Sequence, residues 1–246
     1  MKPALVLLPG MDGTGELFAP ALRVLEPDFD CTVVSYPDRR ATYAQHVEIA
    51  RRELPKDRPF LLLGESFSGP VAISIAANAP PNLMGLILCA SFAACPNRLL
   101  SLLKPLTVFA SPKLLPVVVA QRVLLGKFST PGLRAALERA LSHVSSGTLT
   151  ARLRAMSELD MRERLRNVTL PVLYLRARSD RLVPESAADE VLALARNAEL
   201  ASLDGPHMLL QAQRSECAAH IREFERRIRL AEIAGAPAPA VAPRTQ

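Results

Sequence analysis

The chain has 246 residues, 49% of them hydrophobic, 4% aromatic and none Trp, so we expect one sizeable domain with a core of aliphatic side chains. The formal net charge is +6, but basic residues are interspersed with acidic ones, as in MRERLRN and IREFERRIRLAE. This mixture is typical of solvated helix faces and argues against a nucleic-acid partner. The four cysteines form no C-x-x-C pair, which favours free thiols in a reducing compartment over disulfides or a metal site.

The apolar stretches are short. The first one is interrupted by Pro9 and Gly10, which leaves too few residues for the core of a signal peptide. Longer apolar stretches contain Lys and Pro, as in SLLKPLTVFASPKLLP, and none has the length of a membrane span. We therefore expect a soluble cytoplasmic protein without stable membrane insertion. The oligomeric state stays open at this point.

Short apolar runs alternate with stretches of helical periodicity along the chain. Six runs are predicted to be strands: Ala4–Leu8, Cys31–Ser35, Phe60–Gly64, Leu83–Ala90, Val172–Arg176 and Ala198–Ser202. Helices are predicted over Glu16–Leu25, Thr42–Leu54, Phe67–Ala77, Glu185–Ala195 and Met208–Ala234. This alternation predicts an α/β fold with a doubly wound parallel sheet. Ligands bind beyond the carboxyl ends of such strands, so functional residues are expected in the loops that follow them.

The interval 91–166 breaks the alternation and contains several apolar helical patterns. We interpret it as a helical cap inserted into a core formed by residues 1–90 and 167–234. The segment 235–246, GAPAPAVAPRTQ, is rich in Pro and Ala and is predicted to be disordered.

The third predicted strand runs directly into GESFSG, residues 64–69, and a helix follows. A serine on a tight strand-to-helix turn with small neighbours is typical of a nucleophile, with the pattern G-x-S-x-G. Here Ser66 occupies the nucleophile position, and Ser68 stands where the pattern has its last Gly. Pro70 falls in the first turn of the helix, where proline is tolerated. The alternative is that Ser66 only begins the helix.

The first predicted strand is followed by LLPGMDGTGELF, with glycines at 10, 13 and 15. No Lys follows in the phosphate-loop pattern, and the spacing is not G-x-G-x-x-G. The loop is better suited to hold the oxyanion of an acyl-transfer reaction. We expect the N–H groups of Met11 and Phe67 to be the two donors.

A serine nucleophile needs a base, and the chain has four histidines. Only His207, in SLDGPHMLLQ, lies in a loop after a predicted strand. His46 and His220 lie within helices among polar neighbours and are expected to be exposed, and His143 ends a helix of the predicted cap. The alternative is that His207 simply begins the last helix.

The base also needs an orienting carboxylate. Asp180 follows the fifth predicted strand and is the first candidate, although it could also be a capping or turn residue. Asp204 is nearer to His207 in sequence and is the lesser candidate. Glu65 adjoins Ser66 and is expected to point away from it.

The order Ser66, Asp180, His207 on a doubly wound sheet resembles the α/β-hydrolase superfamily. The resemblance covers the chain from LVLLPGMDG to GPHMLLQ and is nearest to small capped esterases of the pimeloyl-carrier-protein methyl esterase type. It implies that Ser66 attacks the acyl carbon, His207 transfers the proton and Asp180 holds the imidazole. The chain departs from the family pattern at Ser68, at Pro9-Gly10 where His-Gly is common, and in lacking two strands before that loop.

The resemblance implies a serine hydrolase that cleaves a carboxylic ester through an acyl-enzyme, without metal or cofactor. A thioesterase, an acyltransferase or a carbon–carbon bond hydrolase would use the same triad, and a non-catalytic binding protein on this fold is the alternative from another class. Haloalkane dehalogenases and epoxide hydrolases would need Asp in place of Ser66. The aliphatic residues of the interval 91–166 suggest a pocket for an apolar acyl chain, so a medium-chain ester should be cleaved faster than an acetate.

Overall fold

The computed structural model describes residues 2–96 and 117–234. Within these ranges, six parallel strands form one sheet in the order β2-β1-β3-β4-β5-β6. The strands are β1 (Ala4–Leu8), β2 (Asp30–Val33), β3 (Phe60–Glu65), β4 (Leu83–Cys89), β5 (Val172–Ala177) and β6 (Ala198–Leu203). The predicted doubly wound parallel sheet is confirmed.

The central strands are buried on both faces. Every residue of β1 and β3 is buried, whereas the edge strands β2 and β6 are partly exposed. Each fully buried Leu, such as Leu61, Leu62 and Leu63, contributes about 1.5–3 kcal/mol relative to an exposed side chain. The uninterrupted apolar runs of the sequence are therefore what the central strands of a covered sheet require.

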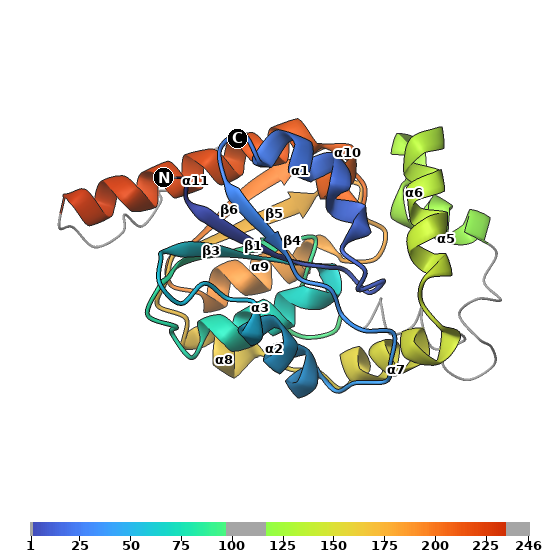
Figure 1. Ribbon diagram of the computed structural model, residues 1–246, viewed down its shortest axis with the longest axis horizontal. Coiled ribbons are helices and arrows are strands. Elements are labelled where there is room, and N and C mark those ends of the chain that lie inside the picture. Colours follow the sequence, from blue (N-terminus) through green and yellow to red (C-terminus); the bar gives the residue numbers. More distant parts are fainter. Residues whose placement is uncertain (1, 97–116, 235–246) are drawn as a thin grey trace.

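Helices cover both faces of the sheet (Figure 1). One face packs against α2 (Tyr43–Arg52), α3 (Gly69–Ala76), α8 (Arg162–Arg166) and α9 (Glu185–Leu194). The other face packs against α1 (Ala19–Leu25), α10 (Leu209–Ala212) and α11 (Arg214–Ile233). A 3-10 turn, Glu16–Phe18, precedes α1.

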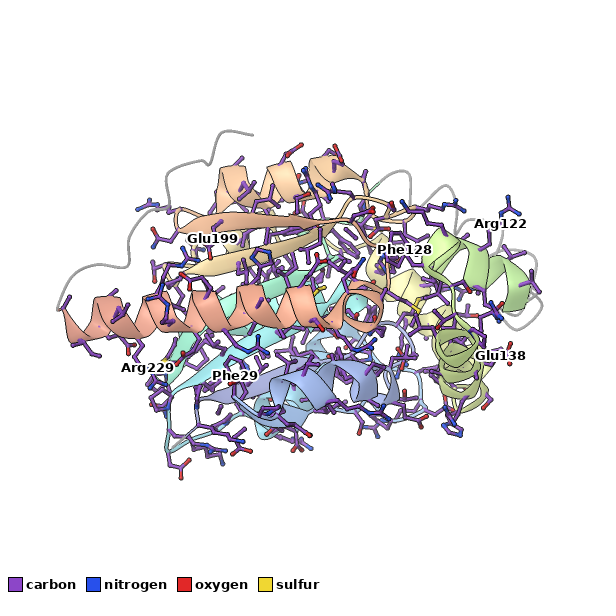
Figure 2. All side chains as sticks on the ribbon, turned by 90° about the horizontal axis from the view of Figure 1, so that it is seen from above. Phe29, Arg122, Phe128, Glu138, Glu199 and Arg229 are labelled. Atoms are coloured by element: carbon purple, nitrogen blue, oxygen red, sulfur yellow. The ribbon has the colours of Figure 1, made fainter. Side chains whose placement is uncertain are left out.

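The helices α5 (Val117–Leu124), α6 (Pro131–Ser142) and α7 (Ser146–Ser157) stand beyond the carboxyl ends of the strands (Figure 1). Seen from above, α11 lies along the sheet, with Arg229 near the C-terminal end of this helix (Figure 2). Arg122 and Glu138 mark the opposite end of the molecule (Figure 2). The division into a core and a cap over 91–166 stays a prediction. Residues 97–116 of the predicted helical interval, and the predicted disorder of 235–246, lie outside the described residues.

The strand order reverses between β1 and β3, because the chain moves outward from β1 to β2 and then returns to the other side of β1. The loops that follow the carboxyl ends of β1 and β3 therefore run in opposite directions and leave a crevice between them. Such a crevice is the usual ligand site of these sheets. Among the described residues, no helix has the length and apolar character needed to cross a membrane.

Two expectations about the helices are wrong. The single helix predicted over Met208–Ala234 is divided at Gln213, whose ψ of 39° is not helical and whose Nε2 donates to the Asp204 carbonyl. His46 is buried rather than exposed, because its ring packs among Tyr36, Tyr43 and Phe67. Burial lowers the pKa of His46 to about 4, so its ring is neutral and Nδ1–H donates to the Thr42 carbonyl at 2.7 Å.

Candidate active site

Ser66 lies at the junction of β3 and α3, in a 3-10 turn of residues Ser66–Ser68. Its φ is +48°, in the left-handed region that residues with a side chain rarely adopt. Such strain persists only where the surroundings enforce it, and it is frequent at functional sites. The turn therefore presents the Ser66 hydroxyl at the carboxyl edge of the sheet.

Close packing around the turn explains its small residues. A Cβ on Gly64 would lie 2.6 Å from the Ser68 carbonyl oxygen, and a Cβ on Gly69 would lie 1.8 Å from Ser91 Oγ. Neither position therefore accepts a side chain without local rearrangement. Ser91 also donates to the Ser66 carbonyl at 2.6 Å, so the loop after β4 supports the strained residue.

Ser68 occupies the position where the pattern has its last glycine, and it is fully buried. Its hydroxyl donates to the Pro9 carbonyl, and Tyr36 Oη lies 2.9 Å from Ser68 Oγ. Because the Ser68 hydrogen goes to Pro9, the Tyr36 hydroxyl is the donor in the second bond. The serine side chain thus joins the turn to the loop after β1, so the departure from the pattern has a structural role here.

His207 and Asp180 meet Ser66 from the loops after β6 and β5. Ser66 Oγ lies 2.8 Å from His207 Nε2, and His207 Nδ1 lies 2.8 Å from Asp180 Oδ2. Since a carboxylate only accepts, Nδ1 carries the hydrogen, which leaves Nε2 of the neutral ring free to accept the Ser66 proton. Asp180 Oδ1 accepts from the N–H groups of Leu182 at 2.7 Å and Val183 at 3.0 Å, which fixes the carboxylate.

The environment of His207 favours its protonated form. Burial alone would lower the pKa of His207, but the charge and hydrogen bond of Asp180, together with the charge of Glu65, raise it above its ordinary value. The side chains of His207 and Asp180 are 8% and 4% exposed, so water screens this attraction weakly. An imidazolium formed by proton transfer from Ser66 is therefore stabilised at this position.

The other candidates lie elsewhere. Asp204 is exposed and pairs with Lys127 Nζ at 3.5 Å. The carboxylate that contacts His207 is therefore that of Asp180, not that of Asp204. His143 is exposed and its Nδ1 contacts Glu16 Oε1 at 2.7 Å, and His220 is exposed on α11, as expected.

The loop after β1 turns tightly beside Ser66. Gly13 N–H donates to the Gly10 carbonyl at 3.0 Å, and Gly13 and Gly15 both have positive φ. Met11 and Phe67 line the same cavity as Ser66. Within the described part of the chain, the Met11 N–H donates to no group of the protein. The N–H groups at the start of the turn that contains Phe67 have no acceptor within their own helix.

Arg152 of α7 holds this loop, a role that was not predicted from the sequence. Its guanidinium is fully buried and donates to the carbonyls of Met11 at 2.9 Å, Asp12 at 2.7 Å and Pro37 at 3.2 Å. A Cβ on Gly13 would lie 2.5 Å from Arg152 Nη1, so Gly13 makes room for the guanidinium. The signal in the sequence is spacing, since Arg152 shares one helix face with three buried residues, Leu149, Leu153 and Met156.

A cavity of about 110 Å³ lies beside Ser66 and His207. Its wall is largely aliphatic and includes residues from the helices beyond the sheet: Leu124, Leu137, Leu141, Leu149 and Met156. The three other polar side chains in the wall are Asp12, Glu65 and Gln211.

The position of Glu65 contradicts the prediction that its side chain points away from Ser66. It does not turn away from the site but lines the same cavity as Ser66, and it is only 6% exposed. Burial raises the pKa of Glu65 to about 7, against a smaller opposing effect of the hydrogen bond from Gln211. Glu65 is the last residue of β3, which is fully buried and one residue longer than the predicted strand Phe60–Gly64, and the apolar run before it is the sequence signal for its burial.

Comparison with known proteins identifies the family. The model of the family described as serine aminopeptidase, S33 (Hydrolase_4) matches residues 31–210. The chain belongs to this family. A pimeloyl-[acyl-carrier protein] methyl ester esterase from Vibrio parahaemolyticus serotype O3:K6 (strain RIMD 2210633) is 29% identical over 242 residues, covering 90% of this chain and 94% of the relative. A Vibrio campbellii (strain ATCC BAA-1116) protein of the same name is 29% identical over 209 residues, covering 77% of this chain and 81% of the relative.

Solved structures share the fold of this serine aminopeptidase family member. The enol-lactonase from Burkholderia xenovorans LB400 superposes with a TM-score of 0.78 at 15% identity, covering 92% of each chain. The bromoperoxidase from Bacillus anthracis superposes with a TM-score of 0.79 at 15% identity, also covering 92% of each chain. The chain is therefore an α/β-hydrolase, and its family and curated relatives make it a hydrolase of the carboxylesterase type. The resemblance drawn from the sequence is confirmed.

Proposed function

We propose that the chain hydrolyses a carboxylic ester through an acyl-enzyme, with Ser66 as nucleophile, His207 as general base and Asp180 as the residue that orients His207. The observation that carries this proposal is the continuous pair of 2.8 Å contacts from Ser66 Oγ through the His207 ring to Asp180. A nucleophile in contact with a base, and the base in contact with a carboxylate, is the arrangement that activates a hydroxyl group.

The reaction has two halves. His207 Nε2 accepts the Ser66 proton while Oγ bonds to the acyl carbon, and the carbonyl oxygen becomes an anion that the N–H groups of Met11 and Phe67 hold. The anion then collapses, the bond to the alcohol oxygen breaks, and His207 returns the proton to the departing alcohol. A water molecule repeats these steps on the acyl-enzyme, so the products are the alcohol and the carboxylic acid, and the free serine is regenerated.

The curated relatives are named as methyl ester esterases, so the methyl ester of an acyl chain is the substrate class to test first. The aliphatic wall of the cavity supports an apolar acyl chain. A thioesterase or an acyltransferase would share the triad and differ in leaving group or acceptor. No cofactor is part of the proposal, and in the described ranges no group of three or more His, Cys, Asp or Glu is placed to hold a metal ion.

Pre-steady-state hydrolysis of p-nitrophenyl butyrate tests the acyl-enzyme directly. We expect a burst of p-nitrophenol, and intact mass spectrometry should find one butyryl group attached to Ser66. Ser66→Ala should show neither, whereas Ser157→Ala, at an exposed serine of α7, should behave like wild type. A turnover without any serine adduct in rapidly quenched samples, or a burst that persists in Ser66→Ala, would contradict the proposal.

A further inference from the structure

The cavity beside Ser66 has polar side chains in its wall besides those of the proposed triad. Apart from Ser66 and His207, the polar side chains in its wall are Asp12, Glu65 and Gln211, and among the described residues no Lys or Arg side chain lines it. The carbonyl oxygen of an ester binds at the oxyanion site, and the rest of the ester is its acyl part and its alcohol part. Three further polar groups in an aliphatic wall are therefore not needed for ester cleavage itself.

Glu65 and Gln211 form a pair whose hydrogen-bonding capacity is only partly used. Gln211 Nε2 donates to Glu65 Oε1 at 3.0 Å, and the two residues are 1% and 6% exposed. Gln211 Oε1 is buried and has no donor, and within the described chain no group donates to Glu65 Oε2. A buried acceptor without a donor is costly, so a site that leaves one free is suited to a ligand that supplies the hydrogen.

Asp12 adds a further acceptor on the same side of the cavity. Its Oδ2 accepts from the N–H of Thr14 at 2.9 Å and from its hydroxyl at 2.6 Å, which fixes the carboxylate. Asp12 Oδ1 and Glu65 Oε2 lie 3.6 Å and 3.9 Å from the point where a Cβ on Gly10 would stand. The two carboxyl groups thus flank Gly10 together, and acceptors outnumber donors in this part of the wall.

We propose that Glu65, Gln211 and Asp12 form a polar subsite that binds a hydrogen-bond-donating group of the substrate, a hydroxyl or a protonated amine, while the neighbouring ester is cleaved at Ser66. This inference rests on the proposed function and adds a substrate class to it. The donor group bonds to the free Gln211 Oε1 and to Glu65 Oε2. An ester that carries a carboxylate is disfavoured, because two acidic side chains face it without a cation in the wall.

The protonation of Glu65 distinguishes the two kinds of donor. When Glu65 is protonated it donates to a substrate hydroxyl that in turn donates to Gln211, and when it is ionised it attracts an ammonium group. Burial raises the pKa of Glu65 to about 7, so both forms exist near neutral pH.

Matched methyl esters test the subsite. The four-carbon set is methyl butyrate, methyl β-hydroxybutyrate, methyl β-aminobutyrate and monomethyl succinate. A six-carbon set with the substituent at the ω carbon covers a different depth of the cavity. We expect wild type to prefer a hydroxyl or amino ester over its parent by about tenfold in kcat/KM, the size of one hydrogen bond in a desolvated site, and to cleave the carboxylate ester more slowly than the parent.

Two variants separate the roles of shape and polarity, and Asp204→Asn serves as the exposed acidic control. Glu65→Met should abolish the preference for both donors. Glu65→Gln should keep a preference for the hydroxyl ester and lose the preference for the amino ester, because Gln donates and accepts but carries no charge. The melting temperature of each variant shows whether it is folded.

The same esters are titrated by NMR into Ser66→Ala, which separates binding from chemistry. A preference for the donor esters in Ser66→Ala that is lost in the double variant Ser66→Ala/Glu65→Met supports the subsite. This result supports the subsite even if the wild type hydrolyses no ester and the proposed function fails. Hydrolysis of the parent esters, with the same rates of the donor esters relative to the parents in wild type and folded Glu65→Met, would overturn the subsite and leave the proposed function intact. Equal affinities for all esters in Ser66→Ala would also overturn it.

Discussion

The Tyr36 hydroxyl lies 2.9 Å from Ser68 Oγ, and both groups are buried. Ser68 thereby bonds the turn around Ser66 to the chain beyond β2, as Tyr43 Oη does by donating to the Phe67 carbonyl at 3.1 Å. A pattern match would score Ser68 as a defect, since G-x-S-x-G has glycine there. The structure instead gives this serine two hydrogen bonds, to Tyr36 and to the Pro9 carbonyl.

Replacing Ser68 with the glycine of the pattern should therefore lower the stability of the folded protein. Ser68→Gly leaves the Tyr36 hydroxyl and the Pro9 carbonyl without this partner in a buried site, which costs about 1–3 kcal/mol. We expect a lower free energy of unfolding in urea, and Tyr36→Phe in the same background should recover part of the loss by removing the stranded hydroxyl. An unchanged or higher stability of Ser68→Gly would show that the serine is incidental.

Arg152 should act on catalysis through the loop it holds. Arg152→Met removes three hydrogen bonds to the carbonyls of Met11, Asp12 and Pro37, so the Met11 N–H, the proposed oxyanion donor, is no longer fixed in position. Loss of one oxyanion donor costs on the order of 10²-fold in kcat. We expect kcat for p-nitrophenyl butyrate to fall toward that extent with a small change in KM, and Arg152→Lys to recover only part of it.

Arg154→Met is the matched control for that variant, because Arg154 lies on the exposed side of the same helix. Equal kinetic effects of the two substitutions, or a folded Arg152→Met enzyme with wild-type kcat, would contradict a positioning role for Arg152.

The buried Glu65 carboxyl should make folding stability depend on pH. Its pKa is raised from 4.5 to about 7 by burial, so between these values the folded state keeps a proton that the unfolded state has released. Stability then falls as pH rises through this window, by a total of about 3 kcal/mol at 1.36 kcal/mol per pKa unit. Glu65→Gln lacks this loss, and should therefore gain stability relative to wild type between pH 4 and pH 8.

Urea unfolding of wild type, Glu65→Gln and Glu53→Gln across that pH range measures the effect. Glu53 is exposed, so its variant should follow the wild-type curve. Parallel curves for wild type and Glu65→Gln would mean that Glu65 is not held in a desolvated site.

The rate of hydrolysis should rise with pH as His207 loses its proton, because the neutral ring is the proposed base. Burial lowers the pKa of His207, but the Asp180 charge, the Asp180 hydrogen bond and the Glu65 charge together raise it, so the midpoint of kcat/KM should lie above 6.5. Glu65→Gln removes one of the groups that raise the pKa of His207 and should move the midpoint to lower pH. A midpoint below 6.5 in wild type, or one that Glu65→Gln leaves unmoved or raises, would contradict this coupling.

The sheet could be predicted because its central strands are apolar throughout and each is bounded by a polar or glycine-rich loop. The placement of Ser66, Asp180 and His207 at one edge follows from the topology, since the carboxyl ends of parallel strands lie together. Their contacts depend on side-chain directions that no local pattern contains, since Ser66 and His207 are 141 positions apart in the sequence.

Three buried residues of polar or charged type lie where the sequence did not predict them. His46 was expected to be exposed, Glu65 to point away from Ser66, and Arg152 had no predicted role, yet all three are buried. These residue types are usually exposed, so their type alone predicts the wrong environment. His46 lies on the helix face of Tyr43, Val47 and Ala50, which is buried, so the helical period alone would have predicted its burial.

Labelling with a fluorophosphonate probe tests the central claim most directly, because the probe reacts only with an activated serine. Purified wild type, Ser66→Ala and His207→Ala are compared, with Ser157→Ala as the control. We predict rapid labelling of wild type and Ser157→Ala, none of Ser66→Ala, and labelling slowed by several orders of magnitude in His207→Ala. A folded wild type that stays unlabelled, or equal labelling of wild type and His207→Ala, would contradict the assignment of Ser66 and His207 as nucleophile and base.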